Sequence, residues 1–218
     1  MIYKYNNKTH FKNSRDKIII DLCKGKKVLH IGATDSPYTK EKYQNNLLLH
    51  IKIQNCAKDV LGIDIDKESI SYLKTKGVED IIEFNMNNIK SIDFEPDVII
   101  FGETIEHLMN QEIALETLKG AMNQNTQLVL STPNSMWLNN IINTFAYRER
   151  QHPDHKIVFS YATLNNLLIA NNFTIKNVYF TFLDRQKEGI SKHLKKLFCS
   201  LFKGFSETIV YVVEKQKI

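Results

Sequence analysis

The sequence is poor in cysteine and has no long apolar run, and these absences exclude several classes of protein. Its 3 cysteines, Cys23, Cys56 and Cys199, are odd in number and too far apart for a disulfide framework or a zinc-binding pattern. No segment approaches the roughly 18 consecutive apolar residues of a membrane-spanning helix. The N-terminal residues also lack the apolar core of a signal peptide. We therefore exclude a transmembrane protein and expect a cytoplasmic one.

Proline and glycine are also scarce, with 4 and 8 residues respectively, so we expect short loops. No internal repeat or Pro/Gly-rich linker is present. The apolar fraction of 43% and the charged fraction of 24% lie close to the globular average, which excludes a disordered chain. A length of 218 residues suffices for one domain with a full core and is too short for two ordinary domains. Residues 1–218 are therefore expected to form a single domain.

The charge balance is mildly basic, with 29 Lys and Arg against 24 Asp and Glu, a net charge of +5. Nucleic-acid binders usually carry a concentrated basic patch. Here basic residues concentrate only between Arg185 and Lys203. The charge thus favours an anionic partner only weakly.

Short apolar segments alternate with amphipathic ones along the chain. The expected strands are residues 28–31, 60–63, 80–84, 97–101, 128–131, 174–182 and 208–213. The expected helices are residues 9–22, 47–57, 67–75, 112–122, 137–146 and 161–170. This order predicts an α/β fold of the Rossmann-like, doubly wound type, with a mostly parallel seven-stranded sheet. In such sheets the ligand site lies beyond the carboxyl ends of the strands.

Residues at two strand ends indicate a nucleoside site. Asp64 ends the second strand, where a carboxylate can accept both hydrogen bonds of a ribose diol. The alternative role for Asp64 is the N-cap of the next helix, although Asp66 or Ser69 can serve there equally well. Gly32 ends the first strand and allows close approach to the backbone, but residues 33–36 lack the other glycines of a phosphate-binding loop. A nucleoside without a pyrophosphate is therefore favoured over NAD.

With these features, the chain resembles the class I S-adenosylmethionine-dependent methyltransferases. The resemblance is carried by residues 28–33, 60–65, 97–108 and 128–134 together. It implies S-adenosylmethionine as the cofactor, with its methionine part near Gly32, its ribose at Asp64 and its adenine beside Asn85 and Met86. The implied cofactor-binding residues are His30, Gly32, Ala33, Asp64, Ile65, Asn85, Met86, Gly102 and Glu103. The chain departs from the family pattern at His30 and Asn85, where acids are usual, and in the glycine run, of which only Gly32 remains.

Acidic and imidazole groups gather in two segments that suit methyl transfer. Glu103, Glu106 and His107 lie at spacings that place them on one side of a helical turn, and His155 follows in a later loop. In one chemistry, His155, or His107 as the second choice, is the general base that deprotonates an acceptor hydroxyl while Glu106 orients the ring. In the other, two carboxylates and two imidazoles surround a divalent ion. The residues alone leave both open.

The metal chemistry is associated with a narrower resemblance. Glu103-x-x-Glu106-His107, Pro133-Asn134 and Asp154-His155-Lys156 resemble the small-RNA terminal 2′-O-methyltransferases, which implies Glu103, Glu106, His107 and His155 as metal ligands. The continuation from residue 157 to 164 is similar instead to bacterial methyltransferases of glycan and small-molecule biosynthesis. The favoured acceptor is therefore a hydroxyl of a glycan or small molecule. RNA is the alternative, and a non-catalytic interaction module on the nucleoside fold is a third hypothesis.

The segment between the last two expected strands predicts a basic amphipathic helix, within an insert of about residues 185–205. Apolar residues recur there at spacings of three and four, with Lys192, His193, Lys195, Lys196 and Lys203 between them. Such a helix packs on the domain or across a homodimer, or it lies on anionic lipid as a peripheral membrane contact through residues 190–205. The last arrangement would suit a lipid-linked glycan acceptor.

Overall fold

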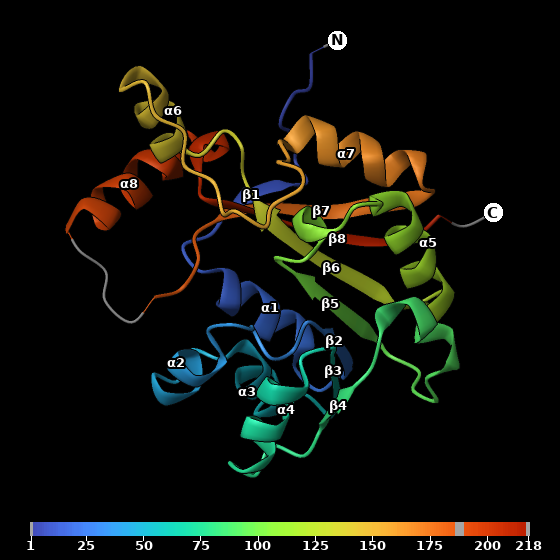
Figure 1. The fold of residues 1–218 in the computed structure, drawn as a ribbon. Helices are drawn as coiled ribbons and strands as arrows, with labels where there is room; N and C mark the ends of the chain where they lie inside the picture. The colour runs from blue at the N-terminus through green and yellow to red at the C-terminus, as the bar shows by residue number, and fades with distance from the viewer. Residues whose placement is uncertain (1, 186–189, 217–218) are drawn as a thin grey trace.

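The computed structural model describes residues 2–185 and 190–216, which form an α/β fold around one sheet (Figure 1). The strand order is β1-β7-β8-β6-β5-β2-β3-β4. The strands are β1 (Thr9–Phe11), β2 (Lys27–Ile31), β3 (Asp59–Asp64), β4 (Ile81–Glu83), β5 (Val98–Gly102), β6 (Gln127–Pro133), β7 (Phe173–Thr181) and β8 (Thr208–Lys215). All neighbouring strands are parallel except at β8, which is antiparallel to both β6 and β7.

Helices cover both faces of this sheet. The α-helices are α1 (Arg15–Cys23), α2 (Thr39–Gln44), α3 (Leu49–Gln54), α4 (Lys67–Lys74), α5 (Gln111–Ala121), α6 (Leu138–Phe145), α7 (Tyr161–Ala170) and α8 (Ile190–Leu201). Three short 3-10 helices are η1 (Met86–Ser91), η2 (Ile105–His107) and η3 (Lys203–Phe205). In Figure 1, α6 and α8 lie side by side away from the layers that cover the sheet.

The central strand β5 shows why the fold is layered. Its Ile99 and Phe101 join the core that contains α5 and α7, whereas Val98 and Ile100 join the core that contains α1 and α3. Successive residues of a strand point to opposite faces, so an apolar run with both faces buried needs helices on both sides. The apolar character of this strand therefore requires the doubly wound arrangement.

The strand count and the first helix differ from the sequence predictions. The sheet has eight strands rather than seven, because Thr9–Phe11 forms β1, in parallel register with Val178–Phe180. The predicted helix over residues 9–22 is therefore wrong in its first part. It begins at Arg15 because the Ser14 hydroxyl accepts a hydrogen bond from the Lys17 amide and caps it. Pairing with a strand more than 160 residues away overrides the local helical pattern.

The order in which strands are added to the sheet reverses at β2, which pairs in parallel with β3 on one side and with β5 on the other. This is the switch point at which open α/β sheets bind ligands. Gly32 follows β2 there, and Glu103 follows β5. None of the helices within the described residues has the length and apolar character needed to cross a bilayer. Part of the predicted insert, residues 186–189, lies outside the described residues.

Candidate active site

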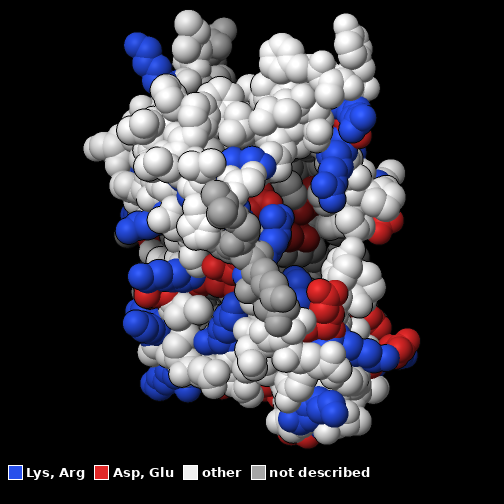
Figure 2. All heavy atoms as spheres, turned by 90° about the vertical axis from the view of Figure 1, so that its left-hand side faces the viewer, with Lys and Arg blue, Asp and Glu red and all other residues white. Residues whose placement is uncertain are grey.

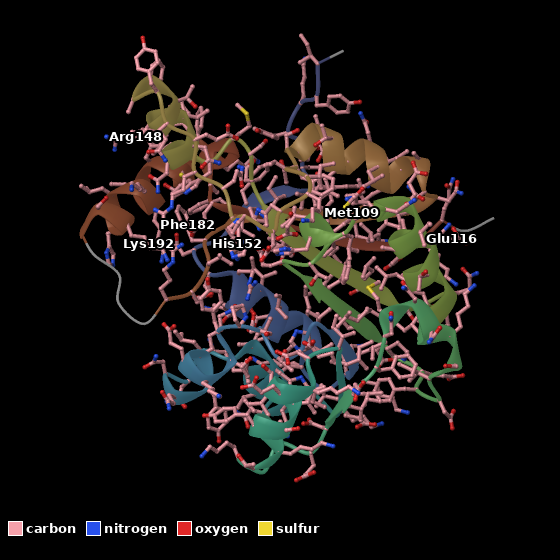
Figure 3. The ribbon with its side chains drawn as sticks, viewed as in Figure 1. Met109, Glu116, Arg148, His152, Phe182 and Lys192 are labelled. Carbon is pink, nitrogen blue, oxygen red and sulfur yellow. The ribbon has the colours of Figure 1, made fainter. Side chains whose placement is uncertain are left out.

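A cavity of about 490 Å³ opens at the carboxyl ends of β2 and β3, and all its lining residues come from positions 31–114. The walls include Gly32, Asp64, Ile65, Asn85 and Met86, which are five of the nine predicted cofactor-binding residues. Most other lining side chains are apolar, among them Met109, labelled in Figure 3. A largely apolar cavity with a carboxylate in its wall suits a nucleoside.

The other four predicted residues lie beside or beneath this cavity rather than in its walls. His30 is buried in β2, with its Nδ1 3.2 Å from Nδ1 of His50, and burial lowers the pKa of His30 well below its usual value. Ala33 is buried, while Gly102 and Glu103 lie at the end of β5. A carboxylate is usual in the family at the position of His30, where this chain has a buried neutral imidazole.

The backbone conformation at position 32 requires glycine. Its φ of +72° is a left-handed conformation, and a Cβ there would lie 3.3 Å from the Thr104 hydroxyl. A residue with a Cβ atom is strained at such a positive φ, so glycine is favoured at this position. The turn after β2 thus brings main chain, rather than a side chain, to the cavity wall.

The carboxylate of Asp64 is already fully hydrogen-bonded. Its Oδ2 accepts from the amide and the hydroxyl of Thr34, at 3.0 and 2.7 Å, and its Oδ1 accepts from the amides of Ile65 and Asp66. The helix cap that the sequence left open belongs to Asp66, whose side chain accepts from the amides of Glu68 and Ser69. A carboxylate accepts about four hydrogen bonds, so a ribose hydroxyl at Asp64 has to displace a protein donor.

Three imidazoles converge at the end of η2, which contains His107. The centroid of the His107 ring lies 4.7 Å from that of His155 and 5.7 Å from that of His152, and one ring nitrogen from each lies within 4.8 Å of the others. The loop that carries His152 and His155 is fixed to η2 because the amides of Lys156 and Ile157 donate to the carbonyl of Glu106. This main-chain contact sets the spacing of the rings.

Both predicted base candidates are largely neutral near pH 7. Burial lowers the pKa of His107, and nearby His152 lowers it further. Burial also lowers the pKa of His155, and His107 adds to this effect. The Nδ1 of His155 lies 3.3 Å from Oε1 of Gln151, a contact that favours the tautomer with the ring proton on Nδ1 and the lone pair on Nε2. His155 therefore has the protonation state of a general base.

The two glutamates accept hydrogen bonds from hydroxyl groups of β6. Glu106 is buried, with Oε2 accepting from the Thr132 hydroxyl, and its Oε1 has no partner. Burial, followed by repulsion from Glu103, raises the pKa of Glu106 to about 8. Glu103 accepts from the Ser131 hydroxyl at 2.9 Å. Of the predicted metal ligands, the structure thus brings together His107 and His155, with His152 in place of the carboxylates.

Glu106 gives a pH prediction. Because its pKa rises from 4.5 to about 8 on folding, the folded state keeps a proton that the unfolded state loses, and this group's contribution to stability falls as pH rises through that window. We expect Glu106→Gln to lose less unfolding free energy than the wild type between about pH 5 and pH 8. Urea denaturation at both pH values measures this, with Glu79→Gln, an exposed glutamate, as the control. Parallel curves for wild type and Glu106→Gln would contradict the assignment.

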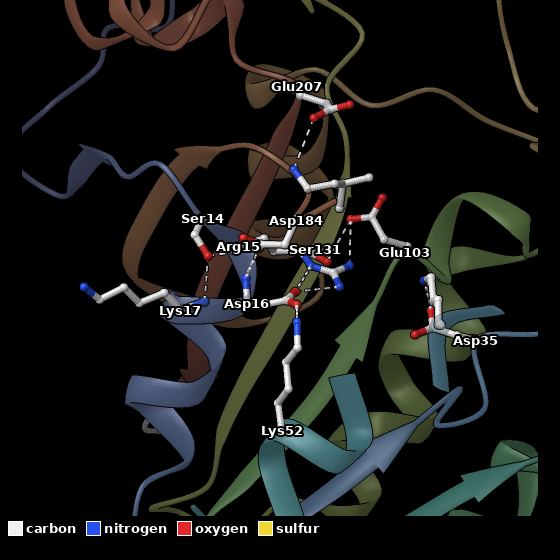
Figure 4. A network of polar contacts seen from close by, with 12 residues as sticks. Ser14, Arg15, Asp16, Lys17, Asp35, Lys52, Glu103, Ser131, Asp184 and Glu207 are labelled. Carbon is white, nitrogen blue, oxygen red and sulfur yellow. Dashed lines mark hydrogen bonds and ion pairs between the residues drawn. The ribbon is translucent and has the colours of Figure 1, made fainter. Parts of the chain in front are cut away.

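A buried ion-pair network, which the sequence predictions missed, supports the end of β5. Arg15 lies 3.0 Å from Asp16 and 3.8 Å from Glu103, and Lys52 lies 2.6 Å from Asp16 (Figure 4). These carboxylates hold the pKa of Arg15 above its usual value against the opposing effect of burial. The available signal was a cation in the first turn of a helix, where the dipole disfavours it.

A second cavity, of about 690 Å³, adjoins the imidazoles, and all its lining residues come from positions 133–208. His152 and His155 line it together with Trp137, Arg185 and Glu207. Arg185 and Glu207 form an ion pair in its wall. The cavity gives a polar molecule access to the imidazole of His155.

Comparisons with known proteins place these features in context. A family model described as a methyltransferase domain matches residues 9–178. A SAM-dependent methyltransferase from Archaeoglobus fulgidus has a TM-score of 0.59 and 18% identity, covering 92% of this chain and 91% of that chain. The small RNA methyltransferase HEN1 has a TM-score of 0.59 and 15% identity, over 94% of this chain and 25% of that chain. A DhpI–SAH complex has a TM-score of 0.52 and 12% identity, over 88% of this chain and 78% of that chain. None of the curated proteins matches. At these identities, the structural likeness shows a shared fold alone.

Proposed function

Because the chain belongs to the methyltransferase-domain family, we propose that it transfers a methyl group from S-adenosylmethionine to a hydroxyl of a glycan or small-molecule acceptor. The observation that carries the proposal is the pair of cavities, one with Asp64 in its wall and the other with His155 in its wall. One is apolar and suits a nucleoside. The other exposes a neutral imidazole to a polar molecule.

The first cavity fits the cofactor by the chemistry of its walls. Ile65 and Met86 offer apolar surface to an adenine ring, Asp64 offers hydrogen-bond acceptors to the ribose, and the main chain at Gly32 leaves room for the methionine part. When bound, S-adenosylmethionine supplies a methyl group on a positively charged sulfur. An enclosed site holds this group against the acceptor and converts a bimolecular step into a unimolecular one.

The acceptor hydroxyl is activated by His155. Its Nε2 would take the hydroxyl proton as the acceptor oxygen bonds to the methyl carbon and the methyl–sulfur bond breaks, with the electron pair of that bond staying on the sulfur of S-adenosylhomocysteine, so the ring would end the reaction as an imidazolium. Gln151 contacts the opposite nitrogen and favours this tautomer. His107 is the second choice of base. The buried Glu106 acts on the histidine loop through its carbonyl, which accepts from Lys156, and not through its carboxyl group.

Cofactor binding is expected to depend on Asp64. Replacing Asp64 with alanine removes the ribose acceptor and should raise the Kd of S-adenosylhomocysteine by about 10- to 100-fold, the value of hydrogen bonds to a charged group. Thr34→Val is the matched control, because it removes one competing donor from Asp64. Its Kd should stay equal to the wild-type value or fall. Calorimetric titration measures both, and an Asp64→Ala variant that binds like the wild type would contradict the ribose assignment.

A second candidate function is metal-dependent methylation of the 2′-hydroxyl at an RNA terminus. The convergence of His107, His152 and His155 favours it, since three imidazole nitrogens within reach of one ion suit a divalent transition metal. The predicted ligands Glu103 and Glu106 would have to turn toward the imidazoles to take part.

One titration separates these functions. The protein is titrated with S-adenosylhomocysteine, with and without Mn²⁺, and the titration is repeated on His155→Ala. If the Kd of S-adenosylhomocysteine is changed neither by Mn²⁺ nor by His155→Ala, the result supports metal-free transfer to a hydroxyl. Separate metal binding that depends on His155 moves the RNA function to first place. Absence of any binding leaves the fold and supports the third hypothesis, a non-catalytic interaction module.

A further inference from the structure

Helix α8 turns its apolar side to solvent. Leu194, Leu197 and Leu201 recur at spacings of three and four and are 63%, 67% and 77% exposed. An amphipathic helix on a protein surface normally faces its apolar stripe to the core. The exposed stripe of α8 is therefore the reverse of the expected orientation.

The lysines of α8 lie on the side that faces the rest of the protein. Lys192 donates a hydrogen bond of 2.6 Å to the carbonyl of Leu183 and lies over the ring of Phe182 (Figure 3). The Nζ of Lys196 also lies over the Phe182 ring, 5.8 Å from its centroid. The Nζ of Lys195 lies 5.9 Å from the centroid of the Trp137 ring. Cations over aromatic faces are attracted to them. These contacts fix the helix with its leucines outward.

Helix α6 adds a second apolar stripe beside α8. None of its residues is buried, Phe145 is 84% exposed, and Tyr147 just beyond its end is fully exposed. The contact of Lys195 with Trp137, at the start of α6, joins the two helices. Figure 2 shows the part of the face over α6 and α8 as mainly uncharged, with Lys and Arg around it. We call the exposed side chains of α6, Tyr147 and α8 the α6–α8 surface.

The two segments that carry this surface hold more basic than acidic residues, with the α8 lysines behind it, on the side that faces the protein, and with Arg148 and Arg150 exposed after α6. Residues 135–160 and 190–206 contain seven basic residues, Arg148, Arg150, Lys156, Lys192, Lys195, Lys196 and Lys203, and two acidic ones, Glu149 and Asp154. A second copy of the chain would bring like charges together, whereas an anionic lipid surface complements them.

We propose that the α6–α8 surface docks on an anionic phospholipid bilayer. The leucines and Phe145 enter the boundary between headgroups and acyl chains, and the arginines lie at the level of the phosphates. The second cavity is lined by Trp137 and Ile142 of the α6 region as well as by His155, so docking places it at the membrane surface. Resting on the proposed function, this identifies the acceptor as a hydroxyl of a lipid-linked molecule.

Vesicle co-sedimentation tests the docking. The wild-type protein is expected to pellet with vesicles of phosphatidylcholine and phosphatidylglycerol, more weakly at high salt, and far less with phosphatidylcholine alone. The double variant Leu197→Glu/Leu201→Glu should lose about tenfold or more of this binding, because two apolar side chains no longer enter the lipid. Ile169→Glu, on exposed Ile169 of α7, is the matched control and should bind like the wild type.

The outcomes separate docking from activity. S-adenosylhomocysteine binding by every variant reports folding and the cofactor cavity, independently of lipid. Failure of the wild type to pellet, or equal pelleting of the double variant, overturns the docking. So does a wild-type dimer in sedimentation equilibrium that the double variant converts to a monomer, since self-association then covers the surface. If the protein binds lipid but not S-adenosylhomocysteine, the docking proposal is supported and the proposed function is wrong.

Discussion

Replacing His155 with alanine is expected to lower kcat by about two to four orders of magnitude, the usual contribution of a general base. The Kd of S-adenosylhomocysteine should change by less than about threefold, because His155 lines the second cavity and not the first. The physical reason is the neutral Nε2 of His155, favoured by burial and by the contact of Nδ1 with Gln151. Single-turnover methyl transfer and calorimetry measure the two quantities.

His152→Ala is the informative partner of this variant. If His155 is the base, His152→Ala should retain most of the turnover, since removing His152 leaves Nε2 of His155 in place. If the three imidazoles bind a metal, both variants should lose metal affinity and activity together. His10→Ala controls for the general effect of losing an imidazole, because His10 lies on β1 and lines neither of the two cavities. Wild-type turnover in His155→Ala would remove His155 from the mechanism and leave His107 as the base.

Replacing Arg15 with methionine is expected to destabilise the protein by about 3–5 kcal/mol, the cost of breaking one side of a buried ion pair. The substitution leaves the half-buried Glu103 carboxylate without Arg15 and removes one partner of the buried Asp16, which keeps Lys52. Lys17→Met, on the exposed side of the same helix, should change the unfolding free energy by less than about 0.5 kcal/mol. Urea denaturation measures both.

The pH dependence of the Arg15→Met variant also tests whether the unpaired Glu103 carboxylate causes the loss of stability. Lowering the pH protonates Glu103, whose pKa is already raised by burial, so the penalty of Arg15→Met should shrink as the pH falls. A difference of less than about 1 kcal/mol at neutral pH would place this network among ion pairs of little energetic consequence.

Several residues of the first cavity could be predicted to lie together because the cavity is built from strand ends. Gly32, Asp64 and Asn85 each follow a short apolar strand, and the carboxyl ends of parallel strands meet at one edge of a sheet. Local pattern and tertiary position agree there. The residues that were missed, Thr34 and Arg15, act through contacts with Asp64 and Glu103 that no spacing in the sequence encodes.

The remaining differences have the same physical origin. Strand β1 exists because residues 9–11 pair with residues 178–180, a contact that local propensity cannot reveal. The periodicity of residues 190–205 indicates which residues share a face of α8, but not which face is turned outward. That orientation depends on Phe182 and Trp137, which come from other elements.

The division of the two cavities along the chain has an evolutionary consequence. Residues 31–114 line the first and residues 133–208 line the second, so a single recombination event between α5 and β6 exchanges the proposed acceptor half and keeps the donor half intact. The contact between Glu106 and the histidine loop uses main-chain atoms, which every sequence provides. A lineage with this architecture can therefore change the residues of the second cavity, the proposed acceptor site, without changing those that line the first, the proposed cofactor site.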